Sequence, residues 1–351
     1  MPTVYSGYYF IKSWAAWRRS VVTTMFLAAL CLAAYPPLAH AVTEVEITRG
    51  VVEPYPIAIT ELYGGGIEEG EMGKSIANVV SDNLERSGLF RSIDRKAFQQ
   101  APEELRLTPR FVDWRQINAQ FLVVGRVQFE VDGQVRVEFR LWDVFAGEHL
   151  VGLSLSTPRE NWRRIAHLIS DQIYKRVTGE EGYFDTRIVY VSESGKQDNR
   201  VKRLALMDQD GANHRYLTDG QYLVLTPRFS PTLQEITYLS YFNDKPRVYI
   251  YNIDTGKQEV LGDFPTMTIA PRFSPDGNKV IMSMAPNGNS DIYVMDLRTR
   301  VVEKLTSHPA IETAPSYSHD GTHITFESDR SGKQQIYVMD AYPGGEERRI
   351  S

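Results

Sequence analysis

The sequence has one cysteine in 351 residues, and this scarcity excludes most thiol chemistry. Cys31 lies in an N-terminal segment that we expect to be removed. The mature chain is therefore predicted to have no disulfide, no reactive thiol and no thiolate-bound metal. Export without cysteines suits a bacterial periplasm, where hydrophobic cores take the place of disulfides.

Hydrophobic runs long enough to cross a membrane are also missing. The apolar run near the N-terminus, Val21 to Ala34, has 14 residues, whereas a membrane-spanning helix needs ~20. Three basic and no acidic residues accompany this run, and Ala39 to Ala41 provide a small-x-small cleavage site. We predict a secretory signal peptide at residues 1–41, cleaved between Ala41 and Val42. The alternative is a retained N-terminal anchor.

The chain lacks an excess of positive charge. Its net charge is -5, and loss of the three basic residues of the signal peptide leaves 36 Lys and Arg against 44 Asp and Glu, about -8. This sign argues against nucleic acid and against anionic membrane surfaces as main partners. Any association with a membrane is expected to be peripheral, through partner proteins only.

Internal repeats dominate the second half of the sequence. Segments that begin at Pro227, Pro271 and Pro315 recur at an interval of 44 residues. A second marker, a strand-like pattern that ends in Asp or Asn, keeps the same interval in four copies: Leu204 to Asp208, Val248 to Asn252, Ile292 to Asp296 and Ile336 to Asp340. A fixed period of this length is typical of repeat architectures.

One copy of the repeat contains four short predicted strands. They cover residues 272–274, 279–284, 291–297 and 301–305, with hairpin turns at Asp276–Gly277 and Asn287–Gly288. Four antiparallel strands per repeat are typical of a propeller blade. We therefore predict an all-β propeller with four blade repeats at residues 179–351; a β-sandwich or β-helix is the alternative.

The first half of the mature chain mixes helix and strand patterns. Strands are predicted at residues 44–48, 55–61, 121–127, 135–145 and 150–155, and amphipathic helices at residues 71–86 and 160–177. These elements predict a compact α/β domain at residues 42–178, ahead of the propeller.

Motifs for catalysis or cofactor binding fail on spacing. The glycines at 64–66 and the Gly73–Ser75 run resemble a phosphate-binding loop, but Glu68 stands where the motif requires glycine. The nucleophile elbow of serine hydrolases does not occur in the sequence. His319 and His323 flank a predicted turn, so they do not form a helical metal pair. We predict no catalytic residue, no cofactor and no metal site.

Several segments resemble the TolB family, particularly the versions found in alphaproteobacteria. The resemblance covers essentially Glu46 to Ser351, and the segments that carry it are Phe139 to Val144, Arg163 to Tyr174, Thr178 to Glu180, Tyr183 to Ile188 and Leu204 to Asp219. It implies a periplasmic, non-catalytic protein of the Tol-Pal system that supports outer-membrane constriction during cell division and outer-membrane integrity. The family also implies six blades, two more than the repeats found here.

The resemblance implies two partners. The first is the peptidoglycan-associated lipoprotein Pal, expected at the mouth of the propeller, on the loop ahead of each proline segment: Met267, Thr268, Ala270, Glu312 and Thr313. The second is the inner-membrane protein TolA, expected on the mature N-terminal segment, with Thr43, Glu44 and Glu46. Other outer-membrane or peptidoglycan-associated proteins are further candidates. The alternative function is a periplasmic propeller that senses a glycan or gates a hydrolase.

Overall fold

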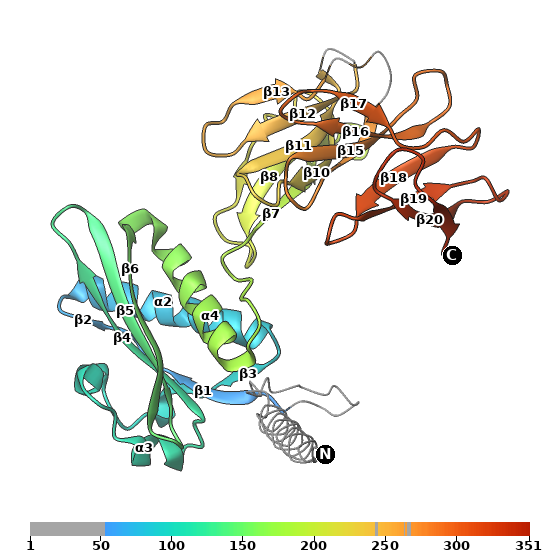
Figure 1. Cartoon of the computed structure of the whole chain (residues 1–351). Helices are drawn as coiled ribbons and strands as arrows, with labels where there is room; N and C mark the ends of the chain where they lie inside the picture. Colours follow the sequence, from blue (N-terminus) through green and yellow to red (C-terminus); the bar gives the residue numbers. More distant parts are fainter. Residues whose placement is uncertain (1–52, 243–244, 263, 265–267) are drawn as a thin grey trace, which may run out of the picture. The chain divides into compact units, whose positions relative to one another are not determined.

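The computed structural model describes residues 53–242, 245–262, 264 and 268–351 (Figure 1). The chain divides after Glu53, and the helices and strands of the described residues all belong to Pro54–Ser351. The predicted signal peptide, its cleavage site at Ala41 and Val42, the expected strand at residues 44–48 and Met267 lie outside the described residues. In the part that is described, every helix is too short or too polar to cross a bilayer.

The α/β part is built on a mixed sheet with the strand order β3-β1-β4-β5-β6, and β2 pairs with β4. The strands are β1 (Tyr55–Ile59), β2 (Tyr63–Gly64), β3 (Phe90–Ser92), β4 (Phe121–Phe129), β5 (Gln134–Asp143) and β6 (Glu148–Pro158). β1 runs parallel to β3 and β4, whereas β4, β5 and β6 form an antiparallel meander. The strands predicted at 55–61, 121–127, 135–145 and 150–155 are confirmed.

Two amphipathic helices cover one face of this sheet (Figure 1). They are α2 (Ile67–Arg86) and α4 (Trp162–Thr178), and their apolar stripes share a core with inward-facing side chains of β4 and β5. α2 begins earlier than predicted, because Glu69 in its first turn accepts a hydrogen bond from the Gly66 N–H at 2.9 Å. α4 ends at Gly179, whose φ of 81° closes the helix in the left-handed region.

Short elements cover part of the other face, and none of them was predicted. They are the 3-10 helices η1 (Arg95–Ala97) and η2 (Pro102–Arg106) and the helix α3 (Phe111–Gln116); a third 3-10 helix, η3 (Arg159–Asn161), leads into α4. Trp114 of α3 is buried against Leu122 and Val124 of β4. Elements of three to six residues carry no measurable periodicity, so only tertiary packing reveals them.

Three four-stranded antiparallel sheets confirm the predicted blades. They are β10 (Val224–Phe229), β11 (Glu235–Ser240), β12 (Arg247–Asn252) and β13 (Gln258–Val260); β14 (Thr268–Phe273), β15 (Lys279–Met284), β16 (Asp291–Asp296) and β17 (Val302–Lys304); and β18 (Glu312–Tyr317), β19 (His323–Ser328), β20 (Gln335–Asp340) and β21 (Glu347–Arg349). The order within each sheet follows the chain, as in a propeller blade.

The first repeat differs from the prediction, because its sheet has three strands: β7 (Arg187–Ser194), β8 (Val201–Asp208) and β9 (Arg215–Tyr216). In the 44-residue repeat, a further strand would begin near Gly182. That segment instead packs on α4: Phe184 is buried in the α/β core, and its N–H donates to Asp171 Oδ1 at 2.7 Å. The repeat period therefore predicts a strand where the chain forms a connection.

The sheets pack side by side through their faces. β10 contacts β14, and β14 contacts β18, so the first strands of successive blades lie next to one another. Between the sheets, side chains of β12 and β15 share one apolar cluster, and side chains of β15 and β16 share another with those of β19 and β20. This arrangement confirms the predicted propeller fold.

Candidate functional site on the first strands of the blades

The first strand of each four-stranded blade contains the same β-bulge. The residue before the proline has a positive φ in all three: Thr226 (48°), Ala270 (53°) and Ala314 (53°). The pairing register shifts at each of these positions. Proline has no N–H to offer to a strand ladder, and a bulge is a place where a strand tolerates it.

The bulge corrects one prediction about the expected Pal site. We predicted a loop ahead of each proline segment and a strand from Arg272, but β14 begins at Thr268 and β18 at Glu312. Thr268, Ala270, Glu312 and Thr313 are therefore strand residues. The prediction fails because Pro271 looks like the residue that precedes a strand, whereas the bulge lets the strand pass through it.

The predicted contact residues differ in how deeply they are buried. Thr268 and Glu312 occupy the same position in the repeat and are 1% and 0% exposed, whereas Ala270 and Thr313 are partly exposed. A fully buried carboxylate offers no surface to a partner, so Glu312 is an internal residue of its blade. Contact with Pal through the other residues stays a prediction.

Glu312 belongs to a buried ionic network within the last blade. Its carboxylate accepts a hydrogen bond from Arg330, whose guanidinium also donates to Glu347 on β21. Burial raises the pKa of Glu312 above its usual range, and hydrogen bonds from Thr306 and Arg330 oppose that shift. The Arg330 guanidinium satisfies Oε1 of this buried carboxylate and offsets part of the cost of burying its charge.

Exposed apolar side chains lie beside the first strands, and the sequence reading did not identify them. Leu223 and Ile311 immediately precede β10 and β18 and are 39% and 50% exposed. Tyr222 and Phe242 lie with their rings 4.7 Å apart beside Leu223. Leu223 and Ile311 occupy the same position in the repeat as Met267. Because Met267 was predicted to contact Pal, the repeat could have indicated Leu223 and Ile311 as well.

A second cluster of polar side chains joins α2 and α4 to the β8–β9 connection. His167 is 2% exposed, and its Nε2 lies 3.7 Å from carboxylate oxygens of both Asp208 and Asp210. Arg163 binds Asp210 at 2.5 Å. The spacing of His167 in the sequence gives no indication of this cluster, because Asp208 and Asp210 are far away in the chain and only the fold brings them together.

The hydrogen-bond network around Asn83 determines the tautomer of His167. Arg86 can only donate, and it donates to Asn83 Oδ1 and to Gln209 Oε1, both at 3.2 Å. Asn83 Nδ2 therefore faces His167 Nδ1 at 2.9 Å, and Nδ1 must accept. The proton of the neutral ring consequently lies on Nε2, directed at the two aspartates.

These three side chains have the donor set of a metal site, since one atom of each lies within 4.8 Å of the others. Metal binding would require an unprotonated Nε2, which the Asn83 contact opposes, and Arg163 already occupies Asp210. The arrangement therefore fits a metal poorly. Burial lowers the pKa of His167, while Asp210 and Asp208 act in the opposite direction.

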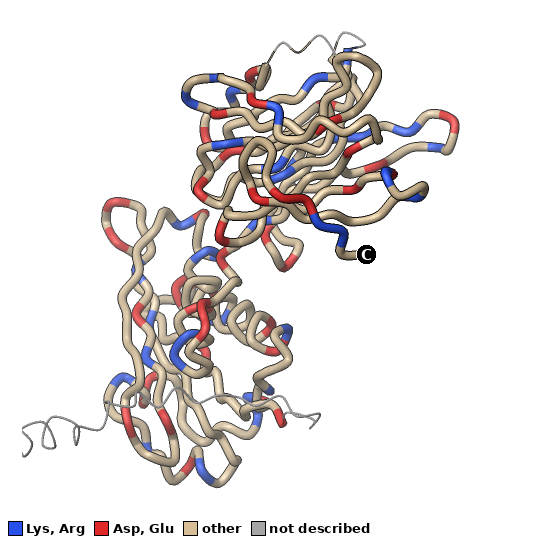
Figure 2. Tube along the Cα trace, turned by 45° about the vertical axis from the view of Figure 1, so that its right-hand side comes forward, with Lys and Arg blue, Asp and Glu red and all other residues tan. Residues whose placement is uncertain are grey.

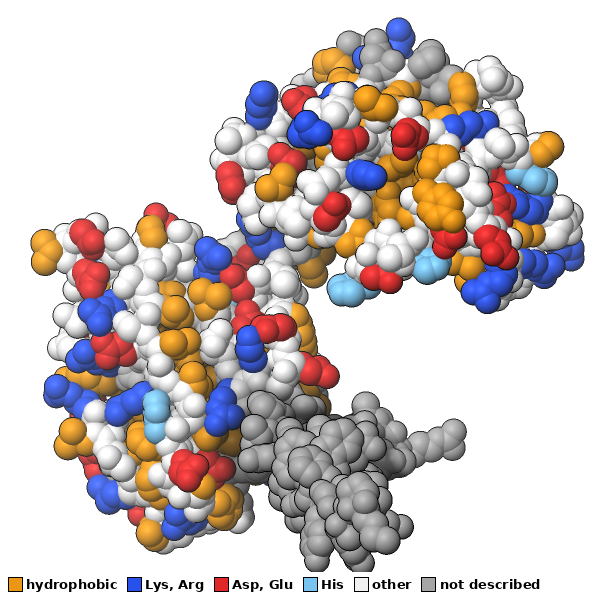
Figure 3. Space-filling view, in the orientation of Figure 1, with side chains coloured by type: hydrophobic (Ala, Val, Ile, Leu, Met, Phe, Trp, Pro, Cys, Tyr) orange, Lys and Arg blue, Asp and Glu red, His pale blue; other side chains and the backbone are white. Residues whose placement is uncertain are grey.

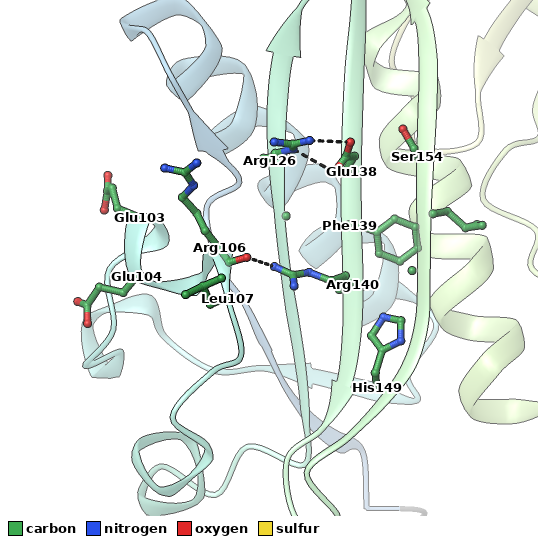
Figure 4. A pocket seen from close by; sticks show the side chains of 13 residues that line it. Glu103, Glu104, Arg106, Leu107, Arg126, Glu138, Phe139, Arg140, His149 and Ser154 are labelled. Carbon is green, nitrogen blue, oxygen red and sulfur yellow. Dashed lines mark hydrogen bonds and ion pairs between the residues drawn. The ribbon is translucent and has the colours of Figure 1, made fainter.

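A cavity of about 870 Å³ lies on the sheet of the α/β part, between the η2 segment and strands β4, β5 and β6 (Figure 4). Arg126 and Glu138 form a two-bond ion pair within it, and Arg140 donates to the carbonyls of Leu105 and Arg106. The Arg126 hydrogen bonds lower the pKa of Glu138. The charged groups of Arg126, Glu138 and Arg140 thus bind one another or the backbone.

Segments of both charge signs are interspersed along the traced chain (Figure 2). On the face drawn in Figure 3, hydrophobic side chains gather over the middle of the propeller, and acidic and basic side chains lie together on the last blade.

Taken together, an α/β domain followed by repeated four-stranded blades defines a propeller-bearing protein. Two family models match the chain: the TolB amino-terminal domain at residues 43–150 and the TolB beta propeller domain at residues 174–351. The chain belongs to the TolB family.

Curated relatives and a solved structure agree with this assignment. The chain is 58% identical over 244 residues to the "Tol-Pal system protein TolB" of Paramagnetospirillum magneticum, covering 70% of this chain and 54% of the relative. It is 56% identical over 236 residues to that of Pelagibacter ubique, covering 65% and 53%. The crystal structure of TolB from Acinetobacter baumannii matches with a TM-score of 0.71 and 29% identity, covering 85% of this chain and 72% of that one. The chain thus spans about half the length of the curated relatives that it matches.

Proposed function

We propose that this chain is a non-catalytic, periplasmic component of the Tol-Pal system. Its proposed role is to bind Pal at the first strands of its propeller and TolA through its mature N-terminal segment. Through these two partners it would support outer-membrane constriction during division and outer-membrane integrity. The proposal follows the names of the relatives at 56% and 58% identity, which are Tol-Pal system proteins.

The observation that supports Pal binding most directly is the repeated, partly exposed bulge. Ala270 and Thr313 lie on β14 and β18, which are adjacent first strands in contact with each other. Ile311 adds an exposed apolar side chain next to Thr313. Small and apolar groups of this kind lose little hydration when a partner covers them, and a standard interface needs ~800 Å² per partner.

The N-terminal segment at residues 42–52 is proposed to bind TolA. Thr43, Glu44 and Glu46 give it a polar, alternating pattern that can add as an extended strand to a partner. The segment can also fold back on the body of its own chain. An exchange between this folded-back state and the TolA-bound state would be a two-state element through which TolA and Pal binding are coupled.

One binding experiment tests both parts of the proposal. Purified Pal and TolA are immobilised separately, and the chain is compared with T313K, A270K and a form that lacks residues 42–52. We expect both lysine variants to weaken Pal binding at least tenfold and leave TolA binding intact, and the deletion to abolish TolA capture. Pal affinity that stays within twofold in T313K and A270K would place the interface elsewhere.

A melting shift with muropeptides, without Pal binding, would favour the glycan-sensing alternative.

A further inference from the structure

The segment Ile311–Thr313 is fixed by contacts from outside its own strand. Asp329 and Arg330, two consecutive residues of the β19–β20 hairpin, supply them. Asp329 Oδ1 accepts the Ile311 N–H at 2.9 Å. Arg330 donates to the Glu312 carboxylate. Both residues that precede Thr313 are thus bound by one dipeptide.

Arg330 is itself held rigidly. Its Nε donates to Ser328 Oγ at 3.0 Å, and its guanidinium carbon lies 4.6 Å from the centre of the Tyr337 ring. A further bond joins it to Glu347 on the last strand of the blade. The Arg330 side chain, 14% exposed, therefore connects the first strand of this blade to its last strand.

A third attachment comes from the preceding blade. The Glu312 N–H donates to the Ser290 carbonyl, and the Glu312 carbonyl accepts from Ser290 Oγ, both at 2.8 Å. The start of β18 is thus fixed on both sides of its backbone, which leaves Thr313 little freedom of orientation.

This arrangement is particular to one blade. At the positions of Asp329 and Arg330, the two preceding four-stranded blades have Ala285 and Pro286, and Tyr241 and Phe242. The position of Glu312 is Thr268 in the preceding blade. The repeat alone does not require an Asp-Arg pair here, so the pair serves the segment Ile311–Thr313 of this blade in particular.

We propose that Asp329 and Arg330 are positioning residues for partner binding, which fix Ile311–Thr313 so that Thr313 is presented to Pal. This inference rests on the proposed function. Neither residue contacts the partner; both act through the backbone and the carboxylate that they bind. It also assigns Glu312 to the internal support of the site.

The test compares D329A with D329N. The asparagine oxygen can still accept the Ile311 N–H, whereas alanine cannot. R330Q removes the charged donor of Glu312, K333Q removes a charge from an exposed residue of the same hairpin as a control, and T313K marks the proposed interface. Pal affinity and amide hydrogen exchange at Ile311 and Glu312 are measured for each full-length variant.

We expect D329A to weaken Pal binding roughly fivefold, as the loss of one hydrogen bond predicts, and to accelerate exchange at Ile311. D329N and K333Q should stay within about twofold of the unaltered chain. If R330Q fails to fold, the comparison of D329A with D329N still tests the positioning role.

Two results would overturn the inference in different ways. If T313K weakens binding but D329A binds as tightly as D329N, the positioning role is wrong and the proposed Pal site stands. If T313K itself leaves Pal affinity unchanged, the proposed site is wrong, and the positioning role fails with it.

Discussion

At the scale of single residues, tertiary contacts create chemistry that the sequence does not indicate. His167 was one histidine among seven with no informative spacing. In the fold, its Nδ1 accepts from Asn83 and its protonated Nε2 faces Asp208 and Asp210. Asp210 stays ionised: burial alone would raise its pKa, but the Ala212 N–H and the Arg163 guanidinium lower it. The His167 tautomer and the Arg163–Asp210 pair together explain why this His-Asp-Asp group is a poor metal site.

This geometry predicts a pH dependence of stability that belongs to His167. Burial lowers the pKa of His167 in the folded chain, so below ~6.5 the unfolded chain takes up a proton that the folded chain resists. Stability is fully present above that pH and falls as the pH drops toward the folded pKa. H167Q should lack this component. The free energy of unfolding in urea is measured at pH 7.5 and 5.5 for the unaltered chain and for H167Q. Groups that titrate equally in both proteins cancel in the difference, so an equal loss of stability in both would contradict the assignment to His167.

At the scale of elements, the repeat predicted hairpin strands well and first strands poorly. The strand expected at 279–284 is β15, with the same bounds, because a short, largely apolar run between Asp-Gly and Asn-Gly turns leaves little freedom in where the strand begins and ends. β14 begins four residues before its predicted start. Its bulge depends on a left-handed backbone conformation at Ala270. Alanine rarely adopts that conformation, so the sequence does not indicate the bulge.

The bulge predicts an unusual effect of glycine on stability. Thr226 is β-branched and has a φ of 48°, a conformation that costs a non-glycine residue ~1 to 2 kcal/mol. Glycine removes that strain but costs ~0.5 to 1 kcal/mol in chain entropy. T226G should therefore raise the free energy of unfolding by about 0.5 kcal/mol. E303G, at an exposed position of β17, should lower it by a similar amount. Chemical denaturation compares the two, and a loss of stability in T226G would argue against strain at the bulge.

At the scale of the whole molecule, the sequence predicted the order of the parts better than their interactions. The α/β elements and the repeated blades appear in the expected order, because both depend on local periodicity. The unpredicted features need contacts between distant segments. Phe184 lies where the repeat predicts a strand but is buried in the α/β core instead. Arg163 and Arg86 bind residues of the β8–β9 connection.

The apolar cores predict how the molecule unfolds. Leu141 and Ile281 are both fully buried, but they belong to clusters that share no residue, one in the α/β part and one between two blades. Polar contacts such as Arg163 with Asp210 join the two parts, and the desolvation cost of a buried ion pair offsets most of its attraction, so it contributes less than core packing. L141A and I281A should each cost ~2 to 5 kcal/mol in their own part. Calorimetry should show each substitution lowering a different transition. A single transition that shifts equally in both variants would mean that the polar contacts suffice to make the two cores unfold as one.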